Sequence, residues 1–505
     1  MLISAAGTLP PIIQGGMGVG VSNWRLAQAV SLKDMLGVIS GTVIDAVMVR
    51  RLQLGDPGGH MRRALAAFPC AKTAQKILDD CFVEGGIAPG KAFHSLSMPN
   101  LKMNIDRMKM MVAAAFAEVW LAREGHSGPV GINLLEKVQL PNLPTLYGAM
   151  LAGVHAVLMG AGVPLAIPGV LDGLAAGQEV RIRLEVKEAG EGRNTEFIFD
   201  PGALGIDVPR PLVRPDFLAI ISSHTIGRVM VRKASGKVDG FVVENHTAGG
   251  HNAPPRQNGT RPGETPAYTQ RDIPELDRIA ELGLPFWLAG SCASPEKLAE
   301  ARAAGAAGIQ IGSAFAFCDE SGIAPELKRR ALKASSEGHL EVRTDFRASP
   351  TGYPFKLIPL EGTLVDGAKA SERERVCDLG FLRSAFEKEG GELGYRCSAE
   401  PVPHFERKGG TAEDTQGRLC LCNGLMATIG LGQRRSYGEE LPIMTAGDAA
   451  ADAATFCKDG RLSYTAADVI EHVLGHVSAI SHTNLEADQR SGGADSNFDL
   501  AADPT

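Results

Sequence analysis

The stretch VVENHTAGGH, residues 242–251, is an apolar run that stops at small residues and a histidine. Two later stretches stop in a similar way: FWLAGS at residues 286–291 and, after a helical segment, GIQIGS at residues 308–313. Small residues let a backbone come close to a ligand. N–H groups from two successive strand ends can converge on a phosphate, and a histidine beside them is a candidate for proton chemistry. These stretches predict a ligand-binding edge of a β-sheet.

Eight apolar segments, most of them followed by a helical pattern, run through the first two thirds of the chain. Repeated strand–helix units with continuous apolar strands imply a parallel sheet. Eight of them favour a closed (β/α)8 TIM barrel over an open doubly wound sheet. A Rossmann domain is the alternative, but no G-x-G-x-x-G follows a strand with an acidic residue about 20 positions later. The predicted strands are residues 11–14, 36–39, 130–135, 156–159, 217–221, 239–244, 285–289 and 308–312.

The barrel domain is predicted to span residues 1–345 and to carry two insertions. Residues 45–127 are too long for an ordinary loop and have helical patterns, which predicts a helical insertion. Alternation of apolar and polar residues in 180–199 predicts a β-hairpin insertion. Residues 346–487 are expected to form an additional, mostly helical C-terminal region. Residues 488–505, rich in Gly, Ser and Asp, are expected to be a disordered tail.

Composition and charge restrict the classes of protein that fit. The 505 residues include 60 glycines and only 5% aromatics, which suits an α/β protein rich in tight turns. A net charge of −7 argues against a nucleic-acid partner. The most apolar long run, residues 110–122, is shorter than the roughly 20 residues of a membrane span. Nine cysteines without a secretory leader predict reduced thiols in the cytoplasm. We expect no membrane partner, and a homodimer is compatible with the sequence.

Polar residues at the ends of the predicted strands are candidates for ligand binding. In TIM barrels the ligand lies at the C-terminal ends of the strands, and a phosphate commonly binds after strands seven and eight. Gly290-Ser291 and Gly312-Ser313 occupy those two positions. Asn133 and Gln310 end apolar strands, where an unpaired amide would be costly. Each could bind the ligand or be satisfied by a neighbouring loop.

His251 is the main candidate for a catalytic base because it follows two glycines at a strand end. His246, five residues earlier, is expected to be a loop histidine bonded to a carbonyl, and His224 is a weaker candidate. Farther along, four cysteines stand out. Cys377, Cys397, Cys420 and Cys422 could bind zinc. Their spacing lacks the common C-x-x-C pairs, so ordinary buried thiols are expected and no metal site is predicted.

Five motifs occur in the order seen in nitronate monooxygenases, formerly called 2-nitropropane dioxygenases. They are QGGMG at 14–18, GINL at 131–134, GAG at 160–162, AGGH at 248–251 and QIGS at 310–313. Flavin-dependent enoyl-acyl-carrier-protein reductases share the pattern. Over roughly residues 10–335 the chain resembles this family, which implies an FMN-containing TIM barrel.

The resemblance also implies roles for individual residues. His251 matches the family histidine that faces the substrate side of the flavin and abstracts a proton or stabilises the nitronate anion. The positions that it places at the cofactor are Gly16, Met17, Asn133, Glu244, Gly249, Gly250, Gly290, Ser291, Gln310, Ile311, Gly312 and Ser313. Two of them depart from the family pattern. Glu244 stands where glutamine is frequent, and Gly290-Ser291 replaces two glycines.

The function that these features predict is an FMN-dependent nitronate monooxygenase. Such an enzyme oxidises alkyl nitronates with O2 to carbonyl compounds and nitrite. The alternatives are an NAD(P)H-dependent reductase of an enoyl thioester, such as an enoyl-acyl-carrier-protein reductase, and a catalytically silent barrel subunit.

Overall fold

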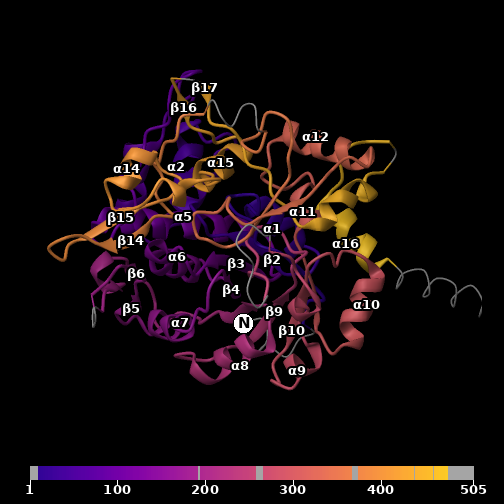
Figure 1. Cartoon of the computed structure of the whole chain (residues 1–505). Coiled ribbons are helices and arrows are strands. Elements are labelled where there is room, and N and C mark those ends of the chain that lie inside the picture. The colour runs from indigo at the N-terminus through magenta and orange to yellow at the C-terminus, as the bar shows by residue number, and fades with distance from the viewer. Residues whose placement is uncertain are drawn as a thin grey trace, which may run out of the picture.

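Eight parallel strands form a closed barrel at the centre of the molecule (Figure 1). The computed structural model describes residues 9–190, 194–256, 266–366, 373–436, 438–458 and 460–475. In the order of their hydrogen bonding, the strands are β1 (Ile12–Gln14), β11 (Gly308–Ile311), β10 (Phe286–Ala289), β9 (Gly240–Glu244), β8 (Asp216–Ile221), β4 (Ala156–Gly160), β3 (Val130–Leu135) and β2 (Gly37–Ser40). This confirms the predicted TIM barrel.

The ring of strands closes between β1 and β2. Ile13 and Leu36 form a parallel bridge there. The N–H of Gln14 donates to the Leu36 carbonyl at 2.9 Å, and the N–H of Leu36 donates to the Ile12 carbonyl at 3.1 Å. Because every strand of the barrel then has two neighbours, the barrel sheet has no open edge.

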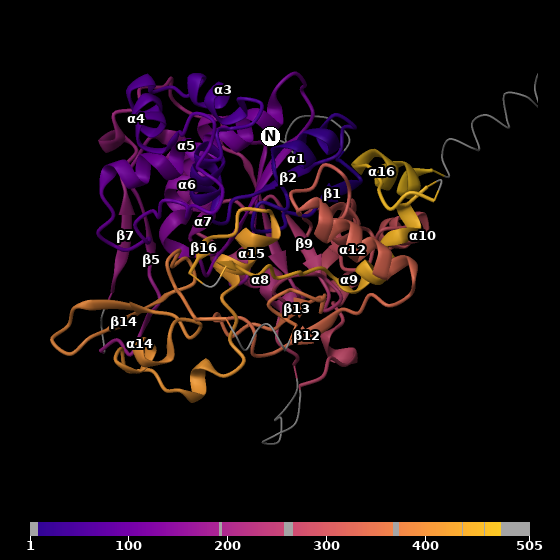
Figure 2. The ribbon, with the colours of Figure 1, turned by 90° about the horizontal axis from the view of Figure 1, so that it is seen from above.

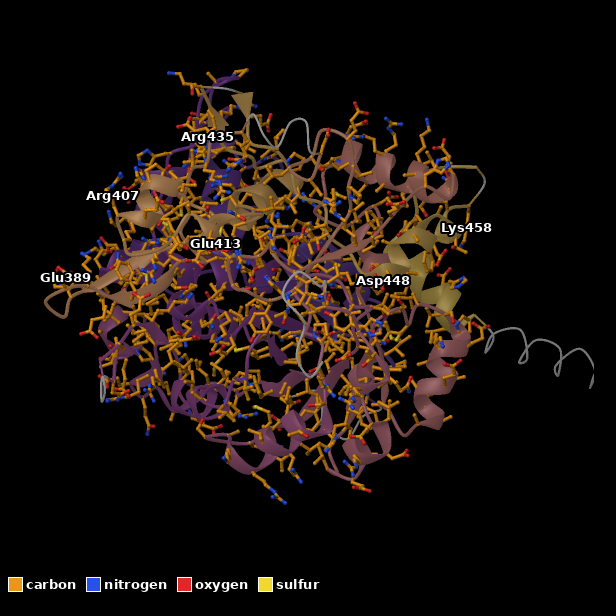
Figure 3. All side chains as sticks on the ribbon, viewed as in Figure 1. Glu389, Arg407, Glu413, Arg435, Asp448 and Lys458 are labelled. Carbon is orange, nitrogen blue, oxygen red and sulfur yellow. The ribbon has the colours of Figure 1, made fainter. Side chains whose placement is uncertain are left out.

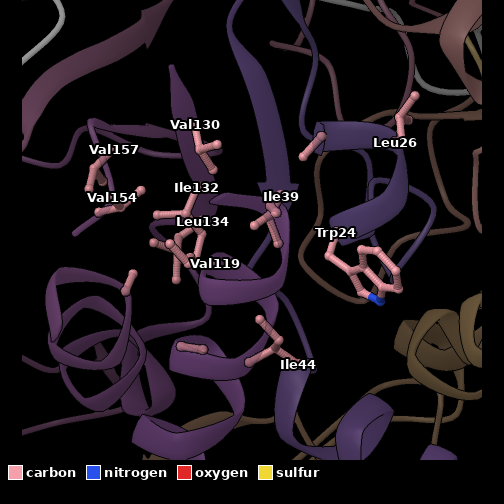
Figure 4. Close-up of a cluster of buried hydrophobic side chains, with 14 of the residues drawn as sticks. Trp24, Leu26, Ile39, Ile44, Val119, Val130, Ile132, Leu134, Val154 and Val157 are labelled. Atoms are coloured by element: carbon pink, nitrogen blue, oxygen red, sulfur yellow. The ribbon is translucent and has the colours of Figure 1, made fainter. Parts of the chain in front are cut away.

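Helices surround the barrel on its outer side (Figure 1). Residues that point outward from the strands, such as Ile39, Ile132 and Val157, pack against helical residues such as Leu26 and Val119 (Figure 4). The helices that follow the strands are α1 (Trp24–Ser31), α5 (Ile105–Arg123), α6 (Gln139–Leu151), α7 (Ile167–Ala176), α8 (His224–Lys233), α9 (Leu276–Ala280), α10 (Pro295–Ala303), α11 (Ser313–Ala316) and α12 (Pro325–Ser336).

Alternate residues of the strands fill the inside of the barrel. Val38, Leu158, Leu218 and Val242 belong to one buried apolar cluster. Trp287 is part of the same cluster, and its indole N–H donates to the Pro10 carbonyl at 2.8 Å. The interior of the barrel is therefore a packed core.

The segment between β2 and β3 consists of four helices: α2 (Ile44–Gln53), α3 (His60–Ala66), α4 (Ala71–Cys81) and α5. Of these, α5 packs against α1 and α6 and so belongs to the ring of barrel helices. A second added segment contains β5 (Val180–Arg183) and β7 (Glu196–Phe199), which pair antiparallel. In the sequence, β6 (Val186–Lys187) lies between these two strands.

The C-terminal region contains short strands as well as helices. It includes β12 (Arg343–Asp345), β13 (Phe355–Leu357), β14 (Ser384–Glu387), β15 (Leu393–Arg396), α14 (Val402–Glu406), α15 (Leu421–Thr428), β16 (Arg434–Arg435), β17 (Gly438–Glu439) and α16 (Ala466–Leu474). The described residues also include the 3-10 helices Gly202–Leu204, Gln270–Asp272, Glu413–Thr415 and Asp448–Phe456.

Several contacts join this region to the barrel domain. Among them, β14 pairs in parallel with β6 of the hairpin segment, and α16 packs beside α1 (Figure 2). Charged side chains such as Glu389, Arg407 and Lys458 lie on the outside (Figure 3). The predicted division of the chain into domains stays a prediction, and the predicted tail at 488–505 lies outside the described residues. Within the described ranges, no helix has the length and apolar character to span a bilayer.

Candidate active site

A pocket lies at the C-terminal ends of the barrel strands, and all thirteen residues predicted for the site line it. They are Gly16, Met17, Asn133, Glu244, Gly249, Gly250, His251, Gly290, Ser291, Gln310, Ile311, Gly312 and Ser313. Strands β1, β3, β9, β10 and β11 bring these residues together from parts of the chain that are far apart. The roles of the individual residues stay predictions.

Two buried polar side chains hold the glycine-rich loop after β1. Gln14 accepts a hydrogen bond from the Val38 N–H at 2.9 Å and donates to Ser22 Oγ at 2.8 Å. Ser22 Oγ in turn donates to the Gly15 carbonyl and accepts from the Met17 N–H. The Ser22 hydroxyl thus shapes the pocket loop, and Asn23 caps α1 by accepting from the Leu26 N–H at 3.0 Å.

Gly16 lies directly against Asn133. A Cβ atom at Gly16 would come within 2.2 Å of the Asn133 Cβ, so a side chain does not fit there. The Asn133 amide donates to the Gly16 carbonyl at 2.8 Å. This bond fixes the orientation of the amide.

Two buried amide oxygens in the pocket wall have no hydrogen-bond partner among the described residues. They are Asn133 Oδ1 and Gln310 Oε1. Buried acceptors are normally satisfied, so this pair indicates a ligand that offers N–H or O–H groups. A flavin ring and its ribityl chain carry such donors, and the residues therefore fit this cofactor.

The loops after β10 and β11 leave room for a compact anionic group. Gly290 has φ +109°, and a Cβ there would lie 2.2 Å from Asn245 Oδ1. A Cβ at Gly312, by contrast, would meet nothing closer than the Met17 sulfur at 3.9 Å, so this glycine faces open space. The first N–H groups of α11, which starts at Ser313, have no carbonyl within the helix to bind. This arrangement fits a phosphate.

His251 is held by the segment 349–355. Its Nε2 lies 2.7 Å from Ser349 Oγ, and its ring packs against that of Phe355 with centroids 4.8 Å apart. The backbones of His251 and Phe355 form an antiparallel bridge. Burial lowers the pKa of His251 to about 4, so the imidazole is neutral near pH 7.

Glu244 lies at the end of β9, and burial raises its pKa to about 7. Glu244 and His251 also line a second pocket, which contains His246 and Tyr268. The rings of His246 and Tyr268 stack with centroids 4.7 Å apart. The expected carbonyl partner of His246 is not seen, because its buried Nδ1 is without a partner in the part of the chain that the structure describes.

Sequence reasoning missed the part of the pocket that the C-terminal region builds. Phe355, Leu425, Thr445, Ala446, Gly447 and Ala449 line the pocket as well. A Cβ at Gly249 would lie 2.6 Å from the Gly447 nitrogen, so Gly249 allows this segment to come close. The Gly447 N–H donates to Ser313 Oγ at 2.9 Å. The small residues of TAGD at 445–448 are the signal in the sequence that could have indicated this contact.

The four cysteines singled out by sequence are all free thiols. Across the described ranges, no group of three or more His, Cys, Asp and Glu side chains is placed to hold a metal ion. His224, the weaker candidate, pairs with Glu275 through Nδ1 at 2.7 Å and does not line the barrel pocket.

Comparisons with known proteins agree with the predicted resemblance. Residues 203–353 match the family model described as nitronate monooxygenase. This stretch includes Glu244, His251, Gly290, Ser291 and Ser313. The match confirms the resemblance to this family.

One curated relative is (3aS,4S,5R,7aS)-5-hydroxy-7a-methyl-1-oxo-octahydro-1H-indene-4-carboxyl-CoA dehydrogenase of Mycobacterium tuberculosis. It is 26% identical over 251 residues, which cover 45% of this chain and 64% of the relative. The match therefore spans less than two thirds of that protein.

Among solved structures, FabK from Thermotoga maritima aligns with this chain over most of its length. It has 15% identity and a TM-score of 0.46, with 95% of this chain and 96% of that chain covered. Nitroalkane oxidase from Streptomyces ansochromogenes has 17% identity and a TM-score of 0.45, with 94% and 97% covered. At these identities and TM-scores, the alignments carry no further conclusion about the fold or the pocket.

Proposed function

We propose that this chain is an FMN-dependent oxidoreductase that oxidises alkyl nitronates with O2 to carbonyl compounds and nitrite. The observation that carries the proposal is the meeting of all thirteen predicted residues at one pocket on the C-terminal rim of the barrel. The nitronate monooxygenase family match over residues 203–353 supports the same reaction class.

The cofactor would be held at three places. The ring would lie against Gly16 and Met17, and the ribityl chain and ring N–H groups would donate to the unpartnered oxygens of Asn133 and Gln310. The phosphate would lie between the loops after β10 and β11, where Gly312 leaves space. When bound, a flavin supplies the electron transfer and the reaction with oxygen. One phosphate site is the reason to propose FMN.

His251 would move the proton. A neutral imidazole that donates its Nε2 proton to Ser349 Oγ has its lone pair at Nδ1. Nδ1 would then accept the proton from the α-carbon of a nitroalkane. Because burial keeps the His251 pKa near 4, the ring is in this neutral form over the physiological pH range.

Glu244 would act as a hydrogen-bond donor to the pocket. With a pKa of about 7, a large fraction of the carboxyl groups is protonated at neutral pH. A protonated carboxyl offers one O–H and one acceptor oxygen, much as the glutamine frequent at this position offers N–H and oxygen. The ionised form would instead place a negative charge beside the cofactor.

The second pocket would accommodate the body of the substrate. It shares Glu244 and His251 with the first pocket, so a molecule there reaches both proton-transfer groups. Its wall combines apolar Val163 and Ile226 with the stacked His246–Tyr268 pair. We expect substrates that carry an apolar chain beside the nitro group.

The test uses the purified protein in air with 2-nitropropane anion or propionate 3-nitronate and without NADH. A flavin absorbance spectrum, oxygen uptake and nitrite release are expected. A flavin spectrum without any response to nitronates would contradict the nitronate substrate.

An enoyl-thioester reductase is the second candidate, and a specific observation favours it. The Mycobacterium tuberculosis relative is named as a dehydrogenase of a carboxyl-CoA compound. In the same preparation, consumption of NADH or NADPH on addition of an enoyl-CoA would support this candidate. Protein without any bound flavin, and without affinity for added flavin, would favour a silent barrel subunit.

A further inference from the structure

Four thiols from the C-terminal region border one small cavity outside the active-site pocket. The cavity is lined by Cys377, Cys397, Cys420 and Cys422, with Arg383 beside them. Cys377, Cys397 and Cys420 pack into one side-chain cluster. Cys397 comes directly after β15, and Cys420 precedes α15, so the cluster lies where several elements of this region meet.

Cys377 and Cys397 are in direct contact within this cluster. Both side chains border the same cavity and pack in the same cluster. The interaction with Cys397 lowers the pKa of the Cys377 thiol despite its burial, and the nearby Arg383 guanidinium lowers it further. The interaction with Cys377 and burial raise the pKa of Cys397 well above its usual value. Cys377 is thus the more acidic thiol of the pair.

A thiolate is the form of cysteine that reacts with oxidants. Cys377 is also the more accessible member of the pair, because it is partly exposed whereas Cys397 is buried. Cys420 is buried as well and takes a different partner, since the Asn423 amide lies 3.5 Å from its sulfur.

We propose that Cys377 and Cys397 are a redox-active dithiol that a hydroperoxide oxidises to a disulfide, and that this bond changes the setting of His251. The Cys377 thiolate attacks the peroxide O–O bond, which gives a sulfenic acid and an alcohol or water. Cys397 then attacks the Cys377 sulfur, and a second water leaves as the S–S bond forms. In sum, two thiols lose two electrons and two protons, and the peroxide is reduced.

The link to the active site runs through residues 349–351. Pro350 borders the thiol cavity, while its neighbour Ser349 bonds His251 at 2.7 Å. Thr351 bonds Ser349 through their hydroxyls at 2.8 Å. Formation of the disulfide requires the two packed but unbonded sulfurs to move to a bond length of about 2.05 Å. Because Pro350 lies against this cavity, we expect the movement to displace Ser349.

The first test is chemical and does not require activity. The purified full-length protein is treated with a tenfold excess of H2O2, then alkylated and mapped by mass spectrometry without reduction. A Cys377–Cys397 cross-linked peptide, lost on treatment with dithiothreitol, is expected. Cys377→Ser and Cys397→Ser should each abolish it, whereas the control variants Cys81→Ser and Cys457→Ser should form it normally.

Three results would overturn the dithiol. They are unreacted Cys377 and Cys397 after oxidation, a cross-link to Cys420 in place of Cys397, and conversion of Cys377 to the sulfinic acid without a cross-link. Thermal unfolding of each Ser variant shows that it is folded. The mapping of the cross-linked peptide does not depend on the proposed nitronate reaction.

The second test addresses His251. Turnover with neutral 2-nitropropane, from which His251 would remove the α-proton, is compared before oxidation, after oxidation and after reduction by dithiothreitol. A loss of at least fivefold that dithiothreitol reverses, and that Cys397→Ser prevents, is expected. A complete disulfide with unchanged turnover would overturn the link to His251. If nitronates are not substrates at all, the fluorescence of bound flavin replaces turnover, and an unchanged signal would have the same meaning.

Discussion

His251 combines a neutral ring, a fixed orientation and a place in both pockets. Replacing it by asparagine removes the base but keeps a polar side chain of similar shape. We expect His251→Asn to retain the flavin spectrum and to lose about 10²–10⁴-fold in kcat with nitroalkane substrates. The visible spectrum and steady-state oxygen uptake measure the two effects. Full activity of a flavin-loaded variant would remove His251 from the reaction.

Ser349 contacts His251 but does not line the pocket, so we expect it to act on the reaction through His251. Ser349→Ala removes the hydrogen bond to Nε2, a bond of about 0.5–1.5 kcal/mol. We expect a roughly tenfold loss in kcat and little change in KM, since the ring loses its orientation. Ser336→Ala, an exposed position on α12, is the matched control. Equal kcat values for the two variants would show that the bond does not orient His251.

Glu244 makes stability depend on pH. Burial raises its pKa from 4.5 to about 7, so the folded protein keeps a proton that the unfolded chain releases in this range. The free energy of unfolding therefore falls as pH rises from about 4.5 to about 7, and this loss is complete above the folded pKa. Glu244→Gln cannot ionise, so it should be more stable than the parent protein at pH 8, by roughly 1–3 kcal/mol.

Denaturant unfolding at pH 8 and at pH 5 checks this difference. At pH 5 the gain should be much smaller, and the exposed control Glu389→Gln should show no gain at either pH. A gain that is the same at both pH values would mean that ionisation of Glu244 is not its cause.

The site residues that sequence could predict are those next to strand ends. Gly290 and Gly312 each follow a run of apolar residues, His251 follows two glycines in the loop after β9, and a barrel brings the C-terminal ends of its strands to one rim. Ser349 has no such signal, because it lies 98 residues from His251 in a turn-rich segment. Its contact with His251 depends on packing between distant parts of the chain.

At the scale of elements, the loops after β9 and β11 contain glycines of different kinds. Gly249 is packed against Gly447, whereas Gly312 faces open space. We expect Gly312→Ala to leave the melting temperature of the flavin-free protein unchanged and to weaken FMN binding at least tenfold, because its methyl group occupies the phosphate space. Thermal unfolding and fluorescence titration with FMN measure the two quantities.

Two variants serve as controls. Gly249→Ala should lower the melting temperature, since its Cβ would lie 2.6 Å from a backbone nitrogen. Gly190→Ala, with no atom within 4 Å of the added Cβ, should change neither quantity. FMN binding by Gly312→Ala that equals that of Gly190→Ala would place the phosphate elsewhere.

Strand positions could be predicted almost to the residue because buried parallel strands are short apolar runs bounded by glycine. The start of α1 shows where local sequence is ambiguous. Ser22 and Asn23 both directly precede the helix, but the Ser22 hydroxyl is bonded to the loop after β1, and Asn23 is the cap. Serine and asparagine are equally good helix caps, so local sequence does not distinguish Ser22 from Asn23. The bonds of the Ser22 hydroxyl to Gln14 and Gly15, which form only in the folded chain, decide which residue caps the helix.

For the whole molecule, the C-terminal region completes the pocket and does not merely follow the barrel. Phe355 and Gly447 line the pocket, and Lys356 forms an ion pair with Asp448 at 2.6 Å beside it. A chain that ends at residue 345 should therefore bind FMN at least 100-fold more weakly or fail to fold. Soluble expression and FMN titration of the truncated chain test this. Truncated protein with full FMN affinity would show that the barrel domain is self-sufficient.

The identity of the flavin tests the central claim most directly. Flavin released from the purified protein is identified by mass, and the flavin-free protein is then titrated with FMN and with riboflavin. We predict one FMN per chain and at least tenfold weaker binding of riboflavin, which lacks the phosphate that the loops after β10 and β11 would hold. No flavin in the purified protein and no binding of either compound would contradict the assignment of this pocket.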